Sequence, residues 1–160
     1  MEIGFLPHAH QQCVAEAVAQ AEALCRLRRV RFTPLRRRVF ELVWESHRPI
    51  GAYEILDRLR EERGQTPAPP TVYRALEFLL SQGLIHRIAA QNAYVGCSFP
   101  RRPHRGQFFV CQECGNVVET SNGGINRAIE QTAEELGFSP SACVVEIYGL
   151  CPTCQEGRRE

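Results

Sequence analysis

Lysine is absent from this sequence: all 19 basic side chains among its 160 residues are arginines. Long apolar runs are missing too, and none approaches the roughly 18 residues of a membrane-spanning helix, which excludes a transmembrane protein. Residues 1–12 lack the basic segment and apolar run of a secretory signal, so we expect no secretion. The composition, 44% hydrophobic and 23% charged, is ordinary for a globular protein and excludes a disordered or fibrous chain.

The arginines are unevenly distributed along the chain. The net charge is only +1, yet residues 1–92 carry 13 arginines against 10 acidic residues, and residues 93–160 carry 6 against 8. Between Arg26 and Arg38 there are seven arginines and no acidic residue. The guanidinium group suits bidentate contacts with phosphate or guanine. A local basic block in a neutral chain indicates that one face meets an anionic surface.

Apolar periodicity and capping signals predict a helical first half that ends in a hairpin. Thr33 followed by Pro34 marks a helix start, with a capping hydroxyl and a first-turn proline. Helices are expected over residues 14–29, 33–46, 51–64 and 70–83, and strands over 84–88 and 93–97. This order of elements is typical of a winged helix-turn-helix.

A break follows at residues 98–105, where two prolines and three arginines surround His104. Beyond it we expect strands over 108–111, 117–119 and 142–148, and a helix over 126–136. Such a small α/β unit cannot bury a large core by itself. Metal binding or dimerisation is the usual remedy.

Eight cysteines in a chain without a secretory signal favour metal binding or redox chemistry over a disulfide scaffold. Four of them form two C-x-x-C pairs, Cys111 with Cys114 and Cys151 with Cys154. Each pair can direct two thiolates at one tetrahedral ion, so together they predict a closed structural zinc site. The alternative is a redox role, which the sequence disfavours because neither pair lies in a thioredoxin-like βαβ setting.

A second set of potential ligands, His86, Cys97, His104 and Glu119, brackets the break between the two halves. Two imidazoles, a thiolate and a carboxylate form an acceptable zinc donor set. None of these spacings is a motif by itself. Taken singly, His86 fits a surface position on a strand, and Cys97 fits a buried thiol. Both the metal-site interpretation and this purely structural one remain open at this point.

Residues that suit nucleic acid lie on the fourth predicted helix and in the basic block. Thr71, Tyr73 and Arg74 lie off the buried stripe near the start of that helix, where a recognition helix contacts bases. Arg31 and Arg36–Arg38 suit phosphate neutralisation. The alternative is that Tyr73 is an ordinary half-buried aromatic and the arginines form a solvated face.

The sequence resembles the ferric uptake regulator superfamily, and within it the zinc uptake regulators, from about Ala21 to Cys154. The resembling stretches are Arg31-Phe-Thr-Pro-Leu-Arg36, Pro69-Pro-Thr-Val-Tyr-Arg-Ala-Leu76, Cys111-Gln-Glu-Cys-Gly115 and Gly149-Leu-Cys-Pro-Thr-Cys154. The resemblance implies an α+β fold in three parts. These are a winged-helix DNA-binding domain over 1–97 with an N-terminal helix, a hinge over 98–105, and a small α/β dimerisation domain over 106–160.

The resemblance also implies roles for individual residues. Cys111, Cys114, Cys151 and Cys154 match the structural zinc ligands, and His86, Cys97, His104 and Glu119 match the regulatory zinc site of zinc-sensing members. Tyr73 and Arg74 match recognition-helix positions.

The expected protein is a cytoplasmic homodimer with two zinc ions per chain. It represses zinc uptake genes by binding pseudo-palindromic double-stranded operator DNA, and it has no enzyme activity, membrane contact or small-molecule substrate.

Three alternatives accompany this expectation: an iron or peroxide sensor of the same superfamily, a thiol oxidoreductase, and a purely structural zinc protein. Cys97 argues against the iron sensor, because a thiolate selects softer metals than the histidine and carboxylate ligands that ferrous iron prefers. An oxidoreductase would instead show a reactive thiol of low pKa.

Overall fold

The computed structural model describes residue 5 and residues 10–64 and 67–157. The chain divides into two compact units: an N-terminal unit that ends at residue 102, and a C-terminal unit that begins at residue 103. The division falls within the segment 98–105 that the sequence marks as a break. None of the helices in the described residues is long and apolar enough to cross a membrane.

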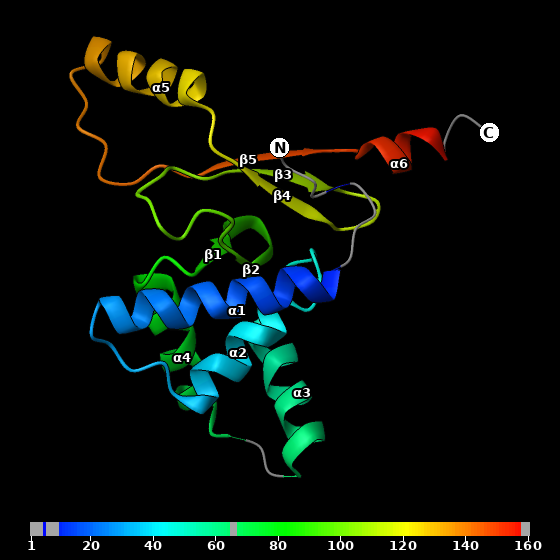
Figure 1. The fold of residues 1–160 in the computed structure, drawn as a ribbon. Coiled ribbons are helices and arrows are strands. Elements are labelled where there is room, and N and C mark those ends of the chain that lie inside the picture. The colour runs from blue at the N-terminus through cyan, green and yellow to red at the C-terminus, as the bar shows by residue number, and fades with distance from the viewer. Residues whose placement is uncertain (1–4, 6–9, 65–66, 158–160) are drawn as a thin grey trace. The chain divides into compact units, whose positions relative to one another are not determined.

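The N-terminal unit is built from four helices and a hairpin (Figure 1). Its elements are α1 (His10–Leu27), α2 (Pro34–Trp44), α3 (Ala52–Arg63), α4 (Pro69–Ser81), β1 (Ile85–Ile88), the 3₁₀ turn η1 (Ala89–Gln91) and β2 (Ala93–Gly96).

Local signals explain where these helices begin and end. Oγ1 of Thr33 accepts a hydrogen bond from the backbone N–H of Arg36 at 3.4 Å, and Pro34 occupies the first turn of α2, as predicted. Gly64 ends α3 at a φ of 65°, a left-handed conformation that glycine adopts without strain. Helix α1 ends at Leu27, two residues before the predicted end, because Arg29 takes a φ of 56° and breaks the helical path.

The hairpin β1–β2 forms the wing of this unit. Its strands pair antiparallel, with His86 opposite Val95. A third segment joins them, because Ile50 and Tyr94 exchange backbone hydrogen bonds of 3.0 and 2.9 Å. Three packed helices and this wing make a winged helix-turn-helix, which confirms the predicted fold of the first half.

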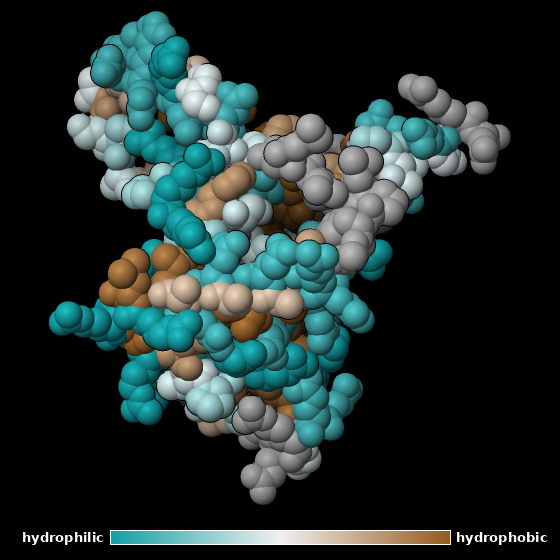
Figure 2. Space-filling model, in the orientation of Figure 1, coloured by the Kyte–Doolittle hydropathy of each residue, from teal (hydrophilic) through white to brown (hydrophobic). Residues whose placement is uncertain are grey.

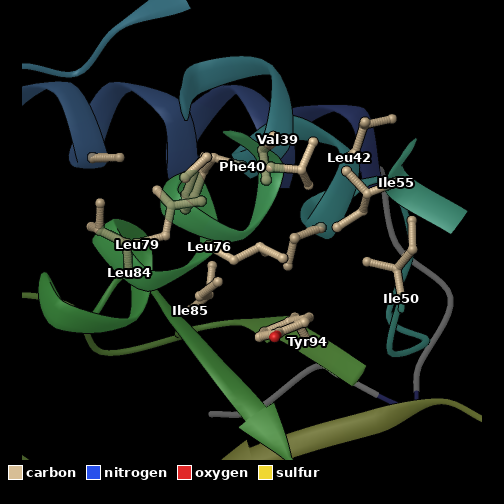
Figure 3. Close-up of a cluster of buried hydrophobic side chains, with 14 of the residues drawn as sticks. Val39, Phe40, Leu42, Ile50, Ile55, Leu76, Leu79, Leu84, Ile85 and Tyr94 are labelled. Carbon is tan, nitrogen blue, oxygen red and sulfur yellow. The ribbon is translucent and has the colours of Figure 1, made fainter. Parts of the chain in front are cut away.

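One hydrophobic core holds the N-terminal unit together (Figure 3). Phe40 of α2, Ile55 of α3, and Leu76 and Leu79 of α4 are almost completely shielded from water. Burial of each such side chain contributes about 1.5–3 kcal/mol. Helix α4 is therefore fixed through its inner face, and its opposite face stays available to a partner.

The C-terminal unit is a small α/β arrangement around one three-stranded sheet (Figure 1). Its elements are β3 (Gln107–Cys111), β4 (Val117–Thr120), α5 (Gly123–Glu135), β5 (Val145–Gly149) and α6 (Pro152–Glu156). Strand β3 is central, antiparallel to β4 and parallel to β5. This confirms an α+β chain with a small second unit.

The sequence misplaced some boundaries in this unit. Helix α5 begins at Gly123 rather than 126, because Oδ1 of Asn122 accepts from the backbone N–H of Gly124 at 2.8 Å and caps it. Strand β5 begins at Val145 rather than 142, where pairing with Gln107 starts. Helix α6 was not predicted at all; Pro152 at its first position is the signal that marks it.

Candidate metal centres and nucleic-acid interface

Two turns of the C-terminal unit carry the four cysteines of the C-x-x-C pairs. Cys111 is the last residue of β3, and the tight turn after it closes through the backbone N–H of Gly115, which donates to the Cys111 carbonyl at 2.9 Å. Gly115 has a φ of 75°, a conformation that favours glycine. The second pair lies at α6, with Cys151 as its N-cap and Cys154 one turn later. The backbone N–H of Gln112 donates to the Gly149 carbonyl and joins the two turns.

The four sulfur atoms form a cluster that fits a tetrahedral zinc ion. All four lie within 4.8 Å of one another, and Sγ of Cys114 is 3.8 Å from Sγ of Cys151. A zinc–sulfur bond of about 2.3 Å in a regular tetrahedron places sulfurs roughly 3.8 Å apart. A disulfide requires about 2.05 Å, and none of the eight cysteines, each within the described residues, forms one. The structure therefore brings the predicted Cys₄ set together.

The thiols of this cluster differ in pKa. Burial raises the pKa of Cys111, but backbone N–H groups directed at its sulfur, first that of Cys151 at 3.4 Å, outweigh burial and lower the pKa to about 6. A hydrogen bond with Cys151, together with burial, raises the pKa of Cys154 to about 12. Cys111 is therefore the thiol of the cluster that loses its proton most easily, and its neighbours must lose theirs when a metal binds, because cysteine ligates as a thiolate.

Two of the second set of ligands lie on the wing of the N-terminal unit. His86 is on β1, and Cys97 directly follows β2, where its backbone N–H donates to the Leu84 carbonyl at 3.0 Å. Because His86 pairs with Val95, it is a diagonal neighbour of Cys97 on the same face of the hairpin. Cys97 is buried and His86 is half-buried. The fold therefore places an imidazole and a thiol together.

The other two ligands of this set meet in the C-terminal unit. Nε2 of His104 lies 2.6 Å from Oε1 of Glu119 on β4. Both side chains are nearly inaccessible to water, and burial of a carboxylate is costly unless it is paired. Each donor is a common zinc ligand. The two units thus each supply one pair of donors, from either end of the same linker.

The predicted recognition residues lie on the outer face of α4. Thr71, Tyr73 and Arg74 are exposed, whereas the inward stripe of Val72 and Ala75 is buried, as the periodicity predicted. These three side chains lie in the first two turns of the helix, where a recognition helix reaches base edges.

Most of the basic block is engaged within the N-terminal unit. Arg38 forms ion pairs with Glu62 of α3 and with Glu41, which raise its pKa above the usual value despite the opposing effect of burial. Arg37 pairs with Glu41 and Glu22. These two guanidinium groups fasten α2 to its neighbours, and so are less available to phosphate than the sequence suggests.

Arg36 and Arg31 occupy different surroundings from that pair. The Arg36 guanidinium stacks 3.7 Å from the ring centre of Phe78 on α4, and it donates to the Arg31 carbonyl. Arg31 itself is exposed. Arg31 is therefore the more accessible cation, and Arg36 contributes packing between α2 and α4 as well as charge.

The chain is similar to known metal-dependent regulators. The model of the Ferric uptake regulator family matches residues 28–148. The chain belongs to the ferric uptake regulator family. It is 42% identical over 142 residues to the Zinc uptake regulation protein of Escherichia coli (strain K12), covering 88% of this chain and 82% of that protein.

Solved structures of other ferric uptake regulator family proteins have the same fold. A zinc uptake regulator complexed with zinc and DNA is 40% identical, covers 92% of this chain and 98% of its own, and superposes with a TM-score of 0.85. The crystal structure of holo XcZur is 38% identical, covers 87% of this chain and 96% of its own, and gives a TM-score of 0.79. This family member is thus similar to zinc regulators along most of its length.

Sequence reasoning missed Gln107, the buried polar residue that supports the C-terminal half of the second site. Its side-chain oxygen accepts from the Asn122 backbone N–H at 2.9 Å and from the Thr120 hydroxyl at 3.2 Å. Its amide nitrogen donates to Oδ1 of Asn126 at 3.0 Å and to the Asn122 carbonyl at 3.1 Å. Gln107 therefore joins the end of β4, next to Glu119, to the start of α5. No sequence signal marks it.

Proposed function

We propose that this ferric uptake regulator family protein is a zinc-responsive transcriptional repressor that acts in the cytoplasm as a homodimer. The observation that carries the proposal is the distribution of donors along the linker. The wing supplies His86 and Cys97, the C-terminal unit supplies His104 and Glu119, and only residues 98–103 separate the two pairs. Together they form the regulatory site.

The regulatory site acts as a cross-link between the two units. A zinc ion bound there would be coordinated by residues of both units at once. Cys97 and His104 are seven residues apart, so even a fully extended linker holds them within about 25 Å of each other. The protein's part is to hold the two donors of each pair close together, so that little side-chain freedom is lost on binding.

The Cys₄ cluster has a different role, because both of its pairs belong to one unit. Cys111, Cys114, Cys151 and Cys154 would hold a closed structural zinc that stabilises the small C-terminal unit. Two zinc ions per chain follow, one structural and one regulatory. The proximity of all four sulfurs favours this reading over two separate redox pairs.

DNA contact is assigned to the N-terminal unit. Tyr73, Arg74 and Thr71 on the exposed face of α4 would enter the major groove, and Arg31 would contact phosphate. Arg36 has a supporting role between α2 and α4. Dimers of helix-turn-helix proteins read half-sites about 34–36 Å apart or multiples of that, so a pseudo-palindromic operator is expected.

Dimerisation is assigned to the C-terminal unit. An apolar groove runs along α5 and the segment after it, lined by Ile125, Ile129, Ala133, Leu136 and Phe138 among others. Leu136 and Phe138 are 76% and 65% exposed, unusual for such large apolar side chains. On the face shown in Figure 2, by contrast, hydrophilic residues cover α5. A second copy of the chain suits the groove.

The regulatory response requires that zinc favour the DNA-binding conformation. A change from 1% to 99% of that conformation needs about 5.5 kcal/mol of differential binding. Restriction of the two units by a shared ion is a physical source of that difference, because it fixes the separation of the two recognition helices in the dimer.

The proposal is tested by metal content and DNA binding measured on one preparation. Zinc per chain is measured by mass spectrometry of the elements, and duplexes are selected from a randomised DNA library at buffered free zinc. We expect two zinc ions per chain, and selection of a pseudo-palindromic duplex only when both sites are filled. Selection of the same duplex with the structural zinc alone would contradict a regulatory role, and selection of no duplex would contradict repression.

A further inference from the structure

Arg28 joins three parts of the N-terminal unit that the sequence keeps far apart. It directly follows α1, and its guanidinium donates to the backbone carbonyl of Gln82 and, at 3.4 Å, to the Gln82 side-chain oxygen. Its other terminal nitrogen donates to the carbonyl of Pro100 at 3.3 Å. Residues 28, 82 and 100 thus meet at one planar cation, whose fork of donors can serve several acceptors at once.

Each contact of Arg28 has a defined position in the site described above. Gln82 is the C-cap of α4, the helix that carries Tyr73 and Arg74. The last carbonyls of a helix lack helical partners and form the negative end of its dipole, so a cation there is favourable. Pro100 lies in the linker, three residues after the ligand Cys97 and four before the ligand His104.

A second, backbone connection runs beside the first. The Cys97 N–H donates to the carbonyl of Leu84, whose own N–H donates to Leu79 in the last turn of α4. The ligand segment is therefore attached to the end of α4 at Cys97 through the backbone, and at Pro100 through Arg28. The Arg28 contact lies on the part of the linker that leads to His104.

From these contacts we infer that Arg28 is a positioning residue that couples zinc occupancy of the regulatory site to the orientation of α4. This inference rests on the proposed function. When Cys97 and His104 bind one ion, the Pro100 carbonyl between them is fixed, and Arg28 then holds the C-terminus of α4 against that fixed point. Without the ion, the linker carbonyl is a less constrained anchor, and the helix end is held less firmly.

The inference separates Arg28 from the other arginines of the basic block. An arginine that only contacts phosphate contributes the same factor to DNA affinity whether or not zinc is bound. An arginine that couples the two sites contributes mainly when zinc is bound, and by thermodynamic reciprocity it also contributes to the rise in zinc affinity that DNA causes.

The test compares Arg28→Ala and Arg28→Lys with the control Arg26→Ala. Arg26 is an exposed arginine of the same helix end, and within the described residues its guanidinium makes no hydrogen bond or ion pair. The duplex selected by the wild-type protein serves as probe, at free zinc that fills only the structural site and at free zinc that fills both. Zinc affinity of the free protein is followed by the fluorescence of Trp44, the single tryptophan. Its ring lies beside Gly96, the residue that precedes Cys97.

Arg28→Ala should reduce the zinc-dependent gain in DNA affinity by about threefold or more. Its zinc affinity without DNA and its melting temperature should stay near those of the wild type. Arg28→Lys should lose most of the gain as well, because an ammonium lacks the planar fork. Arg26→Ala should weaken DNA binding by one factor at both zinc levels.

Two results would overturn the inference: a wild-type gain in Arg28→Ala, or an equal loss at both zinc levels, as for a phosphate contact. If the wild type itself shows no zinc-dependent gain, the proposed function fails, and the role of Arg28 fails with it. A wild type that responds to zinc while Arg28→Ala responds equally contradicts the role of Arg28 alone.

Discussion

Oε1 of Glu119 lies 2.6 Å from Nε2 of His104, and the two side chains are only 2% and 7% exposed. A carboxylate and an imidazole held so close in a dry environment form half of a metal site before any metal arrives. The complementary half, His86 and Cys97, lies on one face of the wing hairpin. In the proposed function, the regulatory response depends on whether one ion engages both halves.

The Cys₄ cluster should be required for folding of the C-terminal unit. Cys111→Ser removes one thiolate of a closed site, and structural zinc contributes about 10–16 kcal/mol of apparent binding energy in small zinc domains. That exceeds the usual stability of a small unit. Loss of one zinc per chain, loss of the dimer and a lower melting temperature are expected, with the N-terminal helices retained in circular dichroism.

Cys13→Ser is the control for that variant, because Cys13 is half-buried on α1 and lies outside both the cluster and the apolar groove. It should keep both zinc ions and the dimer. Should Cys111→Ser remain dimeric and melt at the wild-type temperature, the cluster would not be structural.

Acidification should release zinc from the Cys₄ cluster. The pKa of Cys111 is lowered to about 6 from the 9.0 of an unperturbed cysteine. A group whose pKa is depressed on folding stabilises the protein fully above its unfolded pKa, and this stabilisation is lost as the pH falls through the folded value. Below about pH 6, protons should compete with zinc for this thiolate.

Zinc release to a chromophoric chelator and the melting temperature, both measured against pH, check this expectation. Zinc affinity should already fall gradually from pH 8, because Cys154, whose pKa is raised to about 12, must lose a proton to bind zinc. It should fall more steeply below about pH 6, where Cys111 becomes protonated as well, and the melting temperature of the zinc-loaded chain should follow it. A pH dependence that does not steepen below about pH 6 would show that Cys111 is not the thiolate described here.

Arg74 and Arg36 should differ in how they affect DNA binding. Arg74 is exposed on the outer face of α4, and if it makes a bidentate base contact, Arg74→Ala should weaken binding to the selected duplex by about 1–3 kcal/mol and relax specificity at one position. Arg36→Ala should weaken binding to all duplexes alike and lower the melting temperature, because it also removes the contact with Phe78.

Titrations of both variants with the selected duplex and a scrambled duplex, at several salt concentrations, separate these effects. An equal, sequence-independent loss in the two variants would remove the distinction between a base reader and a supporting arginine.

Gln107 should stabilise the C-terminal unit without binding metal. Gln107→Leu removes the four hydrogen bonds that the fully buried Gln107 side chain makes with Asn122, Asn126 and Thr120. A typical hydrogen bond contributes about 0.5–1.5 kcal/mol, so we expect a loss of about 1–3 kcal/mol. Urea denaturation of the zinc-loaded chain measures this. Gln112→Leu, at an exposed position, should change the free energy of unfolding by no more than about 0.5 kcal/mol. Equal stability of the two variants would show that the hydrogen bonds of Gln107 contribute nothing.

Local signals in the sequence were sufficient for much of the fold. Thr33 followed by Pro34 marks the start of α2, and the apolar stripe of α4 identifies its buried and exposed faces, because capping and periodicity depend on residues that are neighbours in the sequence. The spacing of Cys111 and Cys114, and of Cys151 and Cys154, was enough to predict one site. A C-x-x-C turn directs two thiolates at a common point whatever surrounds it.

Features that depend on long-range contacts could not be found in this way. The sequence places Arg37 and Arg38 in a basic block, but their partners Glu22 and Glu62 lie on other helices and neutralise them only in the folded unit. Gln107 and Arg28 are ordinary polar residues in the sequence, and their importance arises from acceptors up to 72 residues away.

The most direct test of the central claim is the DNA affinity of Cys97→Ser as a function of free zinc. A neutral hydroxyl replaces the soft thiolate, so zinc should bind the regulatory site far more weakly. Fold, dimer and structural zinc should be unchanged, because Cys97 belongs to neither C-x-x-C pair. Cys13→Ser, at a half-buried position on α1, is the control.

The selected duplex should then bind Cys97→Ser poorly at free zinc that saturates the wild type, and binding should return in part at excess zinc, while Cys13→Ser follows the wild-type curve. If Cys97→Ser binds the duplex with wild-type affinity and at wild-type zinc concentrations, zinc at the regulatory site does not control DNA binding.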